Sequence, residues 1–376
     1  MRYLDKIKRA ILVEAVLLSS ACVLWRTGIL REDVTKQENS IEQESATQQG
    51  EAVELEVFAE KTYIKWVDFN VSYEALCEAY QWDVETWQEA AEDKDAVHID
   101  WIELLAYTAA RHGGEFPKEA VSEIAKTAKK LRDKETTMSE LTKDMEYYAY
   151  YLEAYRAVLA GYVGEYEIQK PNEEGQVEWE KCYGLKAFSP VAKGFEYSDY
   201  DDFGASRSYG YARPHLGHDM MGQTGTPIIA IESGYVEAIG WNQYGGWRLG
   251  IRSFDGKRYY YYAHLRQNFP YCKELEEGSV VTAGQVIGYM GHTGYSTEEN
   301  VNNIDVTHLH WGLQLIFDES QKEGNNEIWI DCYNLTRFLY KNRSETVKDM
   351  ETKEWYRIYD MKDPAVEEYQ KSLTNA

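Results

Sequence analysis

The chain is poor in cysteine, and its few cysteines are not spaced for metal binding. It has five in 376 residues, no two of them form a CxxC pair, and they lie far apart, at Cys22, Cys77, Cys182, Cys272 and Cys332. This spacing argues against a zinc site made of thiolates, and an odd, scattered set defines no disulfide framework. The cellular compartment therefore has to be inferred from another part of the sequence.

Basic residues are scarce relative to acidic ones. The chain has 40 Lys and Arg against 64 Asp and Glu, which gives a formal net charge of −24. Binding to nucleic acid depends on clustered Lys and Arg that neutralise phosphates, so we predict that nucleic acid is not a partner. The same charge argues against attachment to an anionic surface by bulk electrostatics.

Only one hydrophobic run approaches the length of a membrane span. Residues 10–25 read AILVEAVLLSSACVLW, include one acidic residue, Glu14, and follow four basic residues in the first nine. A transmembrane helix needs about 20 apolar residues, so a cleaved signal peptide, a signal anchor and a lipoprotein signal ending at Cys22 are the alternatives. Ser19 stands where lipoprotein signals usually carry leucine. We predict that residues 1–31 are a signal anchor of a single-pass cell-membrane protein, with everything after it extracytoplasmic.

The composition then changes twice. Residues 32–60 are rich in Glu, Gln, Ser and Thr, which is typical of a flexible stalk. Residues 61–168 carry apolar side chains at three- and four-residue spacing, and Gly113-Gly114 and Gly161 stand where helices would end. This periodicity predicts a helical bundle domain, and its many Tyr and Trp side chains are interpreted as core and rim.

A Pro, Gly and Glu segment, residues 169–181, is predicted to link the bundle to a β-rich domain at residues 185–335. Of the 27 glycines, 17 lie between Gly204 and Gly312, where they separate short runs of β-forming residues. Residues 336–376 are predicted to be a helical, charged tail. The expected fold class is multidomain α and β: an N-terminal membrane helix, an α-helical bundle and an antiparallel β domain.

Six of the eight histidines lie between positions 215 and 310. In VTHLHWGL, His308 and His310 point to the same face of a strand, roughly 7 Å apart at their Cα atoms. In RPHLGHDMMG, His215 and Asp219 share one face of an extended segment, since the proline and the glycine in this motif argue against a helix. In YYYYAHL, His264 lies at the end of a tyrosine-rich strand.

Together these motifs offer several imidazoles and a carboxylate. Three nitrogen and oxygen ligands with an open fourth position are typical of catalytic zinc, which lowers the pKa of a water to about 7. The remaining histidines would take the water's proton, stabilise the charged intermediate and protonate a leaving amine. The same ligand types also describe non-haem iron oxygenases. Those enzymes usually have the histidine and the acid one residue apart and no adjacent histidine pair, which disfavours them.

The order of the motifs resembles a known family. HLGHD, GTPIIAIESGYVEAIGWNQYGGWRLGIRS, YYYYAHL, EGSVVTAGQVIGYMGHTGYS and HLHWGL follow one another within residues 204–315, as in the lysostaphin-type zinc endopeptidases. Those enzymes cut the peptide bridges of bacterial peptidoglycan. The resemblance implies an antiparallel β-roll with one zinc ion at the floor of a groove. It also implies peptidoglycan stem peptides or cross-bridges as the substrate.

The site residues follow from the same resemblance. It implies that the zinc ligands are His215, Asp219 and His310. It implies that the catalytic residues are His308 as the base, His264 and, to stabilise the oxyanion, Tyr209, for which the neighbouring Tyr211 is an alternative. Two departures stand out. Residues 297–307, TEENVNNIDVT, form an insertion that we expect at the rim of the groove, and His218 replaces a usual aliphatic residue and is expected to pack or face solvent.

A second function stays open at this point. A membrane-anchored scaffold could keep the peptidase fold for docking to a protein partner in the extracytoplasmic space, as some relatives in spore-forming bacteria do. Loss of a metal ligand would favour that role, and none is lost here. A zinc site can nevertheless persist for stability alone, because metal binding is coupled to folding.

Overall fold

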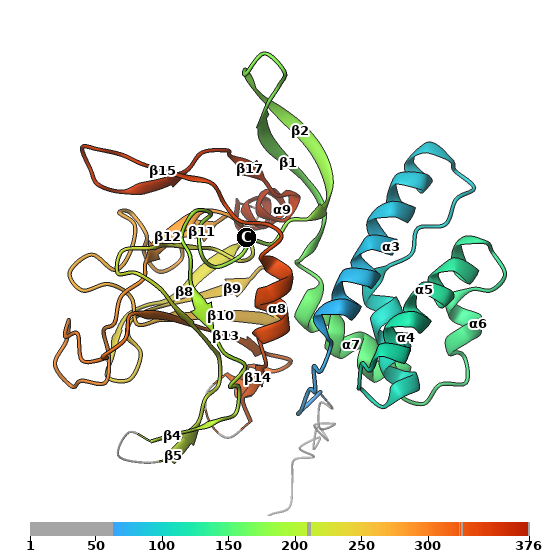
Figure 1. Ribbon diagram of the computed structural model, residues 1–376, viewed down its shortest axis with the longest axis horizontal. Helices are drawn as coiled ribbons and strands as arrows, with labels where there is room; N and C mark the ends of the chain where they lie inside the picture. The colour runs from blue at the N-terminus through green and yellow to red at the C-terminus, as the bar shows by residue number, and fades with distance from the viewer. Residues whose placement is uncertain (1–62, 209–211, 323, 325, 375–376) are drawn as a thin grey trace, which may run out of the picture. The chain divides into compact units, whose positions relative to one another are not determined.

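The computed structural model describes residues 63–208, 212–322, 324 and 326–374. The predicted signal anchor (1–31), nearly all of the stalk (32–60) and Tyr209 lie outside the described residues. In the described part of the chain, no helix is both long and apolar enough to cross a membrane. From residue 62 onward the chain forms one compact unit that contains both helices and sheets (Figure 1).

The region of helical periodicity forms α3 (Tyr73–Glu92), α4 (Trp101–His112), α5 (Lys118–Arg132), α6 (Met138–Thr142) and α7 (Tyr148–Leu159). Ser72 caps α3 by accepting a hydrogen bond from the N–H of Ala75, and Asp100 caps α4 through the N–H of Ile102. The left-handed Gly113, with φ of 65°, ends α4 at the glycine pair that the sequence singled out.

Residues 169–181 lie in a β-hairpin and do not form the linker that their composition suggested. The hairpin strands, and the short third strand paired with them, are β1 (Val163–Pro171), β2 (Val177–Leu185) and β17 (Met361–Lys362). In the turn, Oδ1 of Asn172 accepts hydrogen bonds from the N–H groups of Glu174 and Gln176, and Gly175 has φ of 78°. The Pro, Gly and Asn residues therefore mark a turn between two long strands.

The main sheet has eight strands whose pairings are antiparallel. Seven follow in the order β11 (Val280–Val281), β8 (Gly234–Asn242), β9 (Gly246–Ser253), β10 (Arg258–Ala263), β13 (His308–Leu315), β6 (His218–Met221) and β3 (Ser198–Asp199), and β14 (Ile328–Ile330) also pairs with β13. Two smaller pairs are β7 (Pro227–Ile229) with β12 (Val286–Tyr289) and β4 (Ser206–Ser208) with β5 (Ala212–Pro214). The motif HLHWGL thus occupies an interior strand with neighbours on both sides.

The C-terminal region differs from the helical, charged tail that was predicted for residues 336–376. After the 3-10 turn Glu319–Gln321 come α8 (Tyr333–Leu339), β15 (Thr346–Lys348), β16 (Trp355–Arg357), β17 and α9 (Pro364–Thr374). Between β15 and β16, Asp349 accepts hydrogen bonds from the N–H groups of Glu351 and Thr352, and Lys353 has φ of 65°. Asp side chains that bind the backbone ahead of them favour turns over helix, which explains the hairpin.

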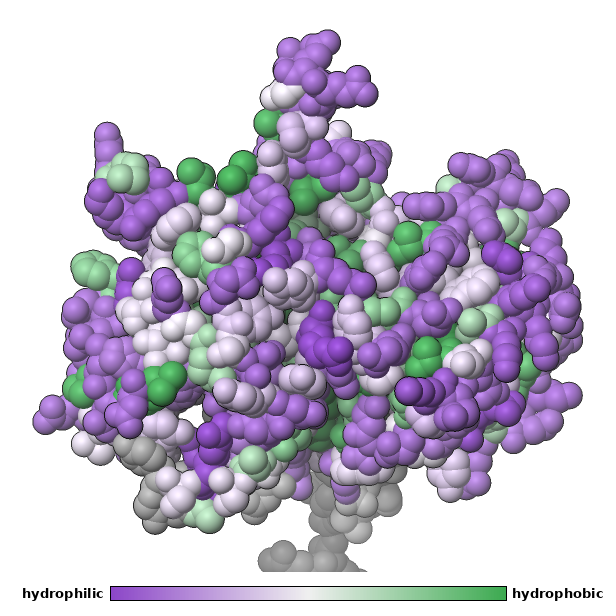
Figure 2. Space-filling model, in the orientation of Figure 1, coloured by the Kyte–Doolittle hydropathy of each residue, from purple (hydrophilic) through white to green (hydrophobic). Residues whose placement is uncertain are grey.

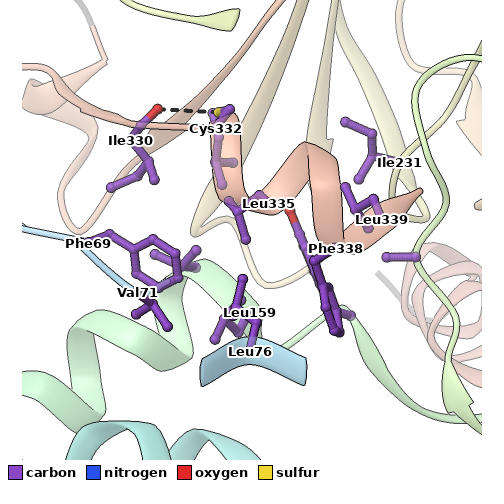
Figure 3. Close-up of a cluster of buried hydrophobic side chains, with 14 of the residues drawn as sticks. Phe69, Val71, Leu76, Leu159, Ile231, Ile330, Cys332, Leu335, Phe338 and Leu339 are labelled. Carbon is purple, nitrogen blue, oxygen red and sulfur yellow. Dashed lines mark hydrogen bonds between the residues drawn. The ribbon is translucent and has the colours of Figure 1, made fainter. Parts of the chain in front are cut away.

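One hydrophobic core joins the helices to the sheet. Figure 3 shows side chains from the helical region and the sheet gathered around α8: Phe69, Val71, Leu76, Leu159, Ile231, Ile330, Cys332, Leu335, Phe338 and Leu339. The apolar side chains of α8 are therefore covered by the helical region on one side and by the sheet on the other, and burial of this area stabilises the two regions together.

On the face seen in Figure 2, hydrophobic residues are scattered among hydrophilic ones.

A buried ion pair lies near the end of α7. Nε of Arg258 is 2.7 Å from Oε2 of Glu232, and its Nη1 donates a hydrogen bond of 3.0 Å to the carbonyl oxygen of Ala157. A Cβ at Gly161 would be 1.8 Å from Oε1 of Glu232, so the glycine leaves the space that the carboxylate occupies. This contact ties the last turn of the helical region to β10.

Candidate metal centre

The sheet brings together residues that are far apart in the sequence. Asp219 on β6 lies directly opposite His310 on β13 in the antiparallel register. Side chains of such cross-strand partners project from the same face. His215 precedes β6, and its backbone is held by hydrogen bonds to the carbonyl of Ala205 and from the N–H of Gly204. A separation of 91 residues between the carboxylate and one imidazole thus becomes a contact between neighbouring strands.

The donor atoms of these three residues form a small triangle. Nε2 of His215 is 3.1 Å from Oδ1 of Asp219 and 3.1 Å from Nδ1 of His310, and the latter two atoms are 2.8 Å apart. Ligands that lie about 2.0–2.1 Å from a tetrahedral zinc ion are roughly 3.3 Å from one another. A slight widening of the triangle would therefore fit zinc. Two imidazoles and one carboxylate form a group of potential metal ligands in the described residues.

A second carboxylate holds the ring of His215. Nδ1 of His215 is 3.0 Å from Oδ1 of Asp202, which fixes the proton on Nδ1 and leaves Nε2 as a donor for a metal. Arg207 contacts Asp202 and also lies 3.1 Å from Oδ2 of Asp219. Sequence reasoning missed both Asp202 and Arg207. No motif spacing identifies them, because Asp202 reaches His215 from a loop and Arg207 reaches it from the short hairpin of β4 and β5.

The pKa shifts of Asp219 and His310 suit metal ligands, and that of His215 has the opposite direction. Burial opposes charge on Asp219, but hydrogen bonds from His215 and His310 outweigh burial and hold the pKa of this carboxyl group well below its usual value. Burial lowers the pKa of His310. Burial also acts to lower the pKa of His215, but the carboxylates of Asp219 and Asp202 reverse the direction and raise it. At neutral pH the group thus holds a carboxylate and a neutral His310 ring, the forms that bind metal ions.

Two further histidines lie beside this group, and Nδ1 of each ring faces a backbone carbonyl oxygen. Nδ1 of His308 is 2.8 Å from the carbonyl oxygen of Val306, and Nδ1 of His264 is 3.0 Å from that of Thr293. Each ring therefore carries its proton on Nδ1, and Nε2 is left as an acceptor. Nε2 of His308 is 3.8 Å from Oδ1 of Asp219. The ring centres of His308 and His264 are 4.7 Å apart.

His264 is held in an unusual state. Its φ is 61°, a conformation that residues other than glycine rarely adopt, and its side chain is buried. Burial, with the neighbouring rings of His308 and His310, lowers the pKa of His264 well below its usual value. A strained backbone and a neutral, buried imidazole next to a cluster of potential ligands are features of functional sites.

The cluster opens into a groove of about 800 Å³ whose lining includes His215, His264, His308 and His310. Gly245 and Gly250 shape one wall, since a Cβ at either position would lie about 2 Å from the hydroxyl of Tyr261 or of Tyr259, respectively. The insertion 297–307 contributes Ile304 to the lining, in line with its expected place at the rim.

The structure also locates the remaining residues that the sequence analysis singled out. His218 is buried and its Nε2 is 2.9 Å from Oδ2 of Asp199, so it packs away from the metal group. Gly217 lies against the ring of His310. The structure brings together five of the six predicted site residues, and their roles in binding and catalysis stay predictions. Tyr209, the sixth, and the alternative Tyr211 fall in the gap at 209–211.

Residues 213–328 match the family model described as Peptidase family M23. The chain is 37% identical over 130 residues to the L-Ala--D-Glu endopeptidase of Bacillus subtilis (strain 168), a match of 35% of this chain and 38% of that protein. It is 38% identical over 89 residues to lysostaphin of Staphylococcus simulans, which covers 23% of this chain and 17% of that protein. The matches therefore span well under half of either relative.

Among solved structures, the catalytic domain of lysostaphin from Staphylococcus simulans is 30% identical. The match covers 38% of this chain and 92% of that one, with a TM-score of 0.29. A protein of Ruminococcus gnavus described as a glycyl-glycine endopeptidase matches over 75% of this chain and 92% of its own, at 23% identity and a TM-score of 0.46.

Proposed function

We propose, since the chain belongs to peptidase family M23, that it is a zinc-dependent endopeptidase that hydrolyses peptide bonds of bacterial cell-wall peptidoglycan. The observation that carries this proposal is the triangle of His215, Asp219 and His310 donor atoms, with Nε2 of His308 3.8 Å from Oδ1 of Asp219. Hydrolysis of a peptide needs an activated water, a base placed next to it and a groove for an extended chain. These residues supply a counterpart for each need.

In this proposal, His215, Asp219 and His310 hold one zinc ion, and Asp202 holds the ring of His215 in place. When bound, zinc supplies Lewis-acid chemistry and lowers the pKa of a water to about 7. The carboxylate and the two imidazoles give the three nitrogen and oxygen ligands of a catalytic site, in which a fourth position stays open.

The two remaining histidines move the protons. Because its Nδ1 proton is donated to the carbonyl of Val306, His308 has Nε2 available to accept the proton of the attacking water and to pass it to the leaving amine. His264 presents Nε2 to the same groove, since its Nδ1 proton is donated to Thr293. We assign to it the second position in this relay, where it would stabilise charge on the substrate. Tyr209 is kept as the proposed oxyanion residue on the sequence resemblance alone.

The bond that is cut is proposed only by class. One relative is named an L-Ala--D-Glu endopeptidase and another a glycyl-glycine endopeptidase. These names describe different bonds, and the chain covers 38% of the first protein and 23% of the second. We therefore propose the stem peptides or the cross-bridges of peptidoglycan as the substrate, without choosing between them.

The place of action is a proposal from the sequence. A signal anchor at residues 1–31 would hold the protein in the cell membrane with the groove on the outer side, where peptidoglycan lies, and an extracytoplasmic protein partner is compatible with this arrangement. Added protease should digest the domain beyond residue 62 in cells whose wall has been removed, without lysis. Protection of this domain in such intact cells would contradict the location.

Digestion of purified peptidoglycan by the full-length protein tests the enzymatic proposal. Zinc-loaded protein should release fragments with new amino termini, identified by mass, and a chelator should stop the release. The variant His308→Ala should be inactive, while His112→Ala, which removes an imidazole bonded to Glu123 in the helical region, should be fully active. No release from several wall chemistries, with zinc bound, would contradict the proposal and favour a scaffold that uses the same fold for docking.

A further inference from the structure

The charge of the groove is opposite to that of the chain. Although acidic residues outnumber basic ones by 64 to 40, the charged residues that line the groove, apart from the ligand Asp219 and the histidines, are Arg207, Arg213, Arg248, Lys322 and Glu327. Four cations against one anion is the reverse of the overall balance. A groove lined by charges of one sign concentrates the electrostatic potential inside it and attracts a ligand of the opposite charge. This groove would therefore attract an anionic ligand.

Neighbouring carboxylates account for two of the four cations. Arg207 contacts Asp202 and Asp219, and Nζ of Lys322 is 2.8 Å from Oε1 of Glu237. These two side chains hold the site and the groove wall together. The other two guanidinium groups, of Arg213 and Arg248, have no carboxylate within 4.0 Å among the residues that the structure describes.

Arg248 stands level with the metal group across the sheet. His310 pairs with Ala263 on β10, and extending the observed Tyr262–Leu249 pair by one residue places Arg248 opposite Ala263 on β9. Cross-strand partners share a face, so Arg248 projects from the same face as His310, two strands away. At about 4.8 Å per strand the two Cα atoms are about 10 Å apart, which is the length of about three residues of an extended peptide.

The surroundings of Arg248 are aromatic. Tyr259 and Tyr261 line the same groove, and the hydroxyl of Tyr271 donates a hydrogen bond of 2.6 Å to the carbonyl oxygen of Arg248. The residue is only partly exposed. Phenol rings can flank a guanidinium group but do not neutralise it. A partly desolvated cation without a counter-charge is costly unless a ligand supplies one.

Arg213 also lines the groove and has aromatic neighbours. Its guanidinium lies over the rings of Tyr244 and Tyr295, at 5.7 Å and 5.3 Å from their centres, and donates a hydrogen bond to the hydroxyl of Tyr295. Stacking of this kind fixes the plane of the guanidinium, which leaves further N–H groups in a fork that matches a carboxylate.

From these positions we infer that Arg248 and Arg213 bind carboxylates of the substrate close to the cut bond. The substrate class is therefore an acidic stem peptide with free carboxylates within about three residues of that bond, and not an uncharged glycine bridge. Arg248 and Arg213 are specificity residues in this account. The inference rests on the proposed function, because it takes the groove beside the metal group as the substrate site.

Binding of matched peptides tests the inference independently of cleavage. The probes are the tripeptide L-alanyl-γ-D-glutamyl-L-lysine, the same peptide with its glutamyl α-carboxyl group and its C-terminus amidated, and pentaglycine amide. With zinc-loaded, full-length protein, the acidic peptide should have a Kd at least about tenfold lower than either uncharged peptide, as expected for charge-assisted hydrogen bonds. The difference should shrink as salt is raised.

Variants identify the residues. Arg248→Gln should reduce the preference for the acid to about twofold or less, Arg248→Lys should retain part of it, and Arg111→Gln, which removes the same charge from a partly exposed helix position, should keep it whole. Unchanged zinc content and melting temperature show that each variant is folded. Arg213→Gln gives a second, independent loss.

Equal Kd values for the acidic and amidated peptides in the wild-type protein, or a full preference in both glutamine variants, would overturn the inference. The same samples are analysed by mass for cleavage. Cleavage with no preference in binding would overturn the inference and leave the proposed hydrolase standing. Selective binding without cleavage of any peptide or of whole peptidoglycan would support the inference and contradict the hydrolase.

Discussion

Gly217 lies against the imidazole of His310. A Cβ at position 217 would be 2.5 Å from Cε1 and 2.6 Å from Nε2 of that ring, and 2.8 Å from the carbonyl oxygen of Trp311. The glycine between His215 and Asp219 thus leaves the space that the ring of His310, the third proposed ligand, occupies. No larger residue fits without moving either the ring or the strand.

The variant Gly217→Ala should therefore weaken zinc binding. Shifts of groups that support a metal ligand typically cost roughly 10- to 100-fold in affinity, and we expect a loss in this range in a competition titration with a chromophoric chelator. Gly164→Ala is the matched control, because the nearest atom to an added Cβ there is 3.6 Å away, an ordinary contact. An unchanged affinity in Gly217→Ala would show that the ring of His310 can move without cost.

Asp202 should act on zinc only through His215. Asp202→Ala removes the acceptor of the His215 Nδ1 proton, so we expect the zinc affinity to fall by roughly 10- to 100-fold, while Asp202→Asn, which keeps an acceptor oxygen, should recover much of it. The exposed neighbour Asp201 provides the control variant Asp201→Ala. Equal affinities for the alanine and wild-type proteins would remove Asp202 from the site.

The two histidines outside the ligand group should separate binding from turnover. His308→Ala and His264→Ala should each bind one zinc ion per chain and lose roughly 10²- to 10⁴-fold in kcat, the usual contribution of a positioned acid or base. Asp219→Ala and His310→Ala should instead lose the metal. Near-normal turnover in His308→Ala would refute its role as base, and a full metal complement in Asp219→Ala would refute the ligand assignment.

The ion pair near the end of α7 should matter for stability and not for zinc. Arg258 and Glu232 are almost fully buried, so Arg258→Met leaves an unpaired buried carboxylate and should lower the free energy of unfolding by about 3–5 kcal/mol. Urea unfolding measures this change. Lys170→Met, at the exposed pair with Glu180, should cost no more than about 1 kcal/mol. A loss below about 1 kcal/mol in Arg258→Met would show that the pair contributes little to the junction.

Strand geometry explains which residues of each motif share a face, and the resemblance to a known family supplied the choice of His215, Asp219 and His310 as the predicted ligands. Alternation places His308 and His310 on one face, and the glycines and the proline near His215 exclude a helix, so residues far apart could be grouped by chemistry. Asp202 and Arg207 could not be found in this way. Their contact with His215 depends on the short pairing of β4 with β5 and on loop hydrogen bonds such as that from the N–H of Gly204 to the carbonyl oxygen of His215.

The errors in the fold have a similar cause. Residues 169–181 have the composition of a linker, but Asn172 and Gly175 close a turn between two strands. Residues 336–376 were expected to be a helical, charged tail, yet Asp349 binds the backbone of its own turn and a hairpin forms. In both places a side chain that bonds to nearby N–H groups decides the structure, and averaged composition does not register it.

The most direct test of the central claim is a titration of metal-free, full-length protein with zinc, in which new amino termini released from peptidoglycan are counted at each step. We expect no release without zinc, a linear rise up to one equivalent per chain and a plateau beyond it, with His310→Ala inactive throughout. Release by metal-free protein, or none at one equivalent when binding is complete, would contradict it.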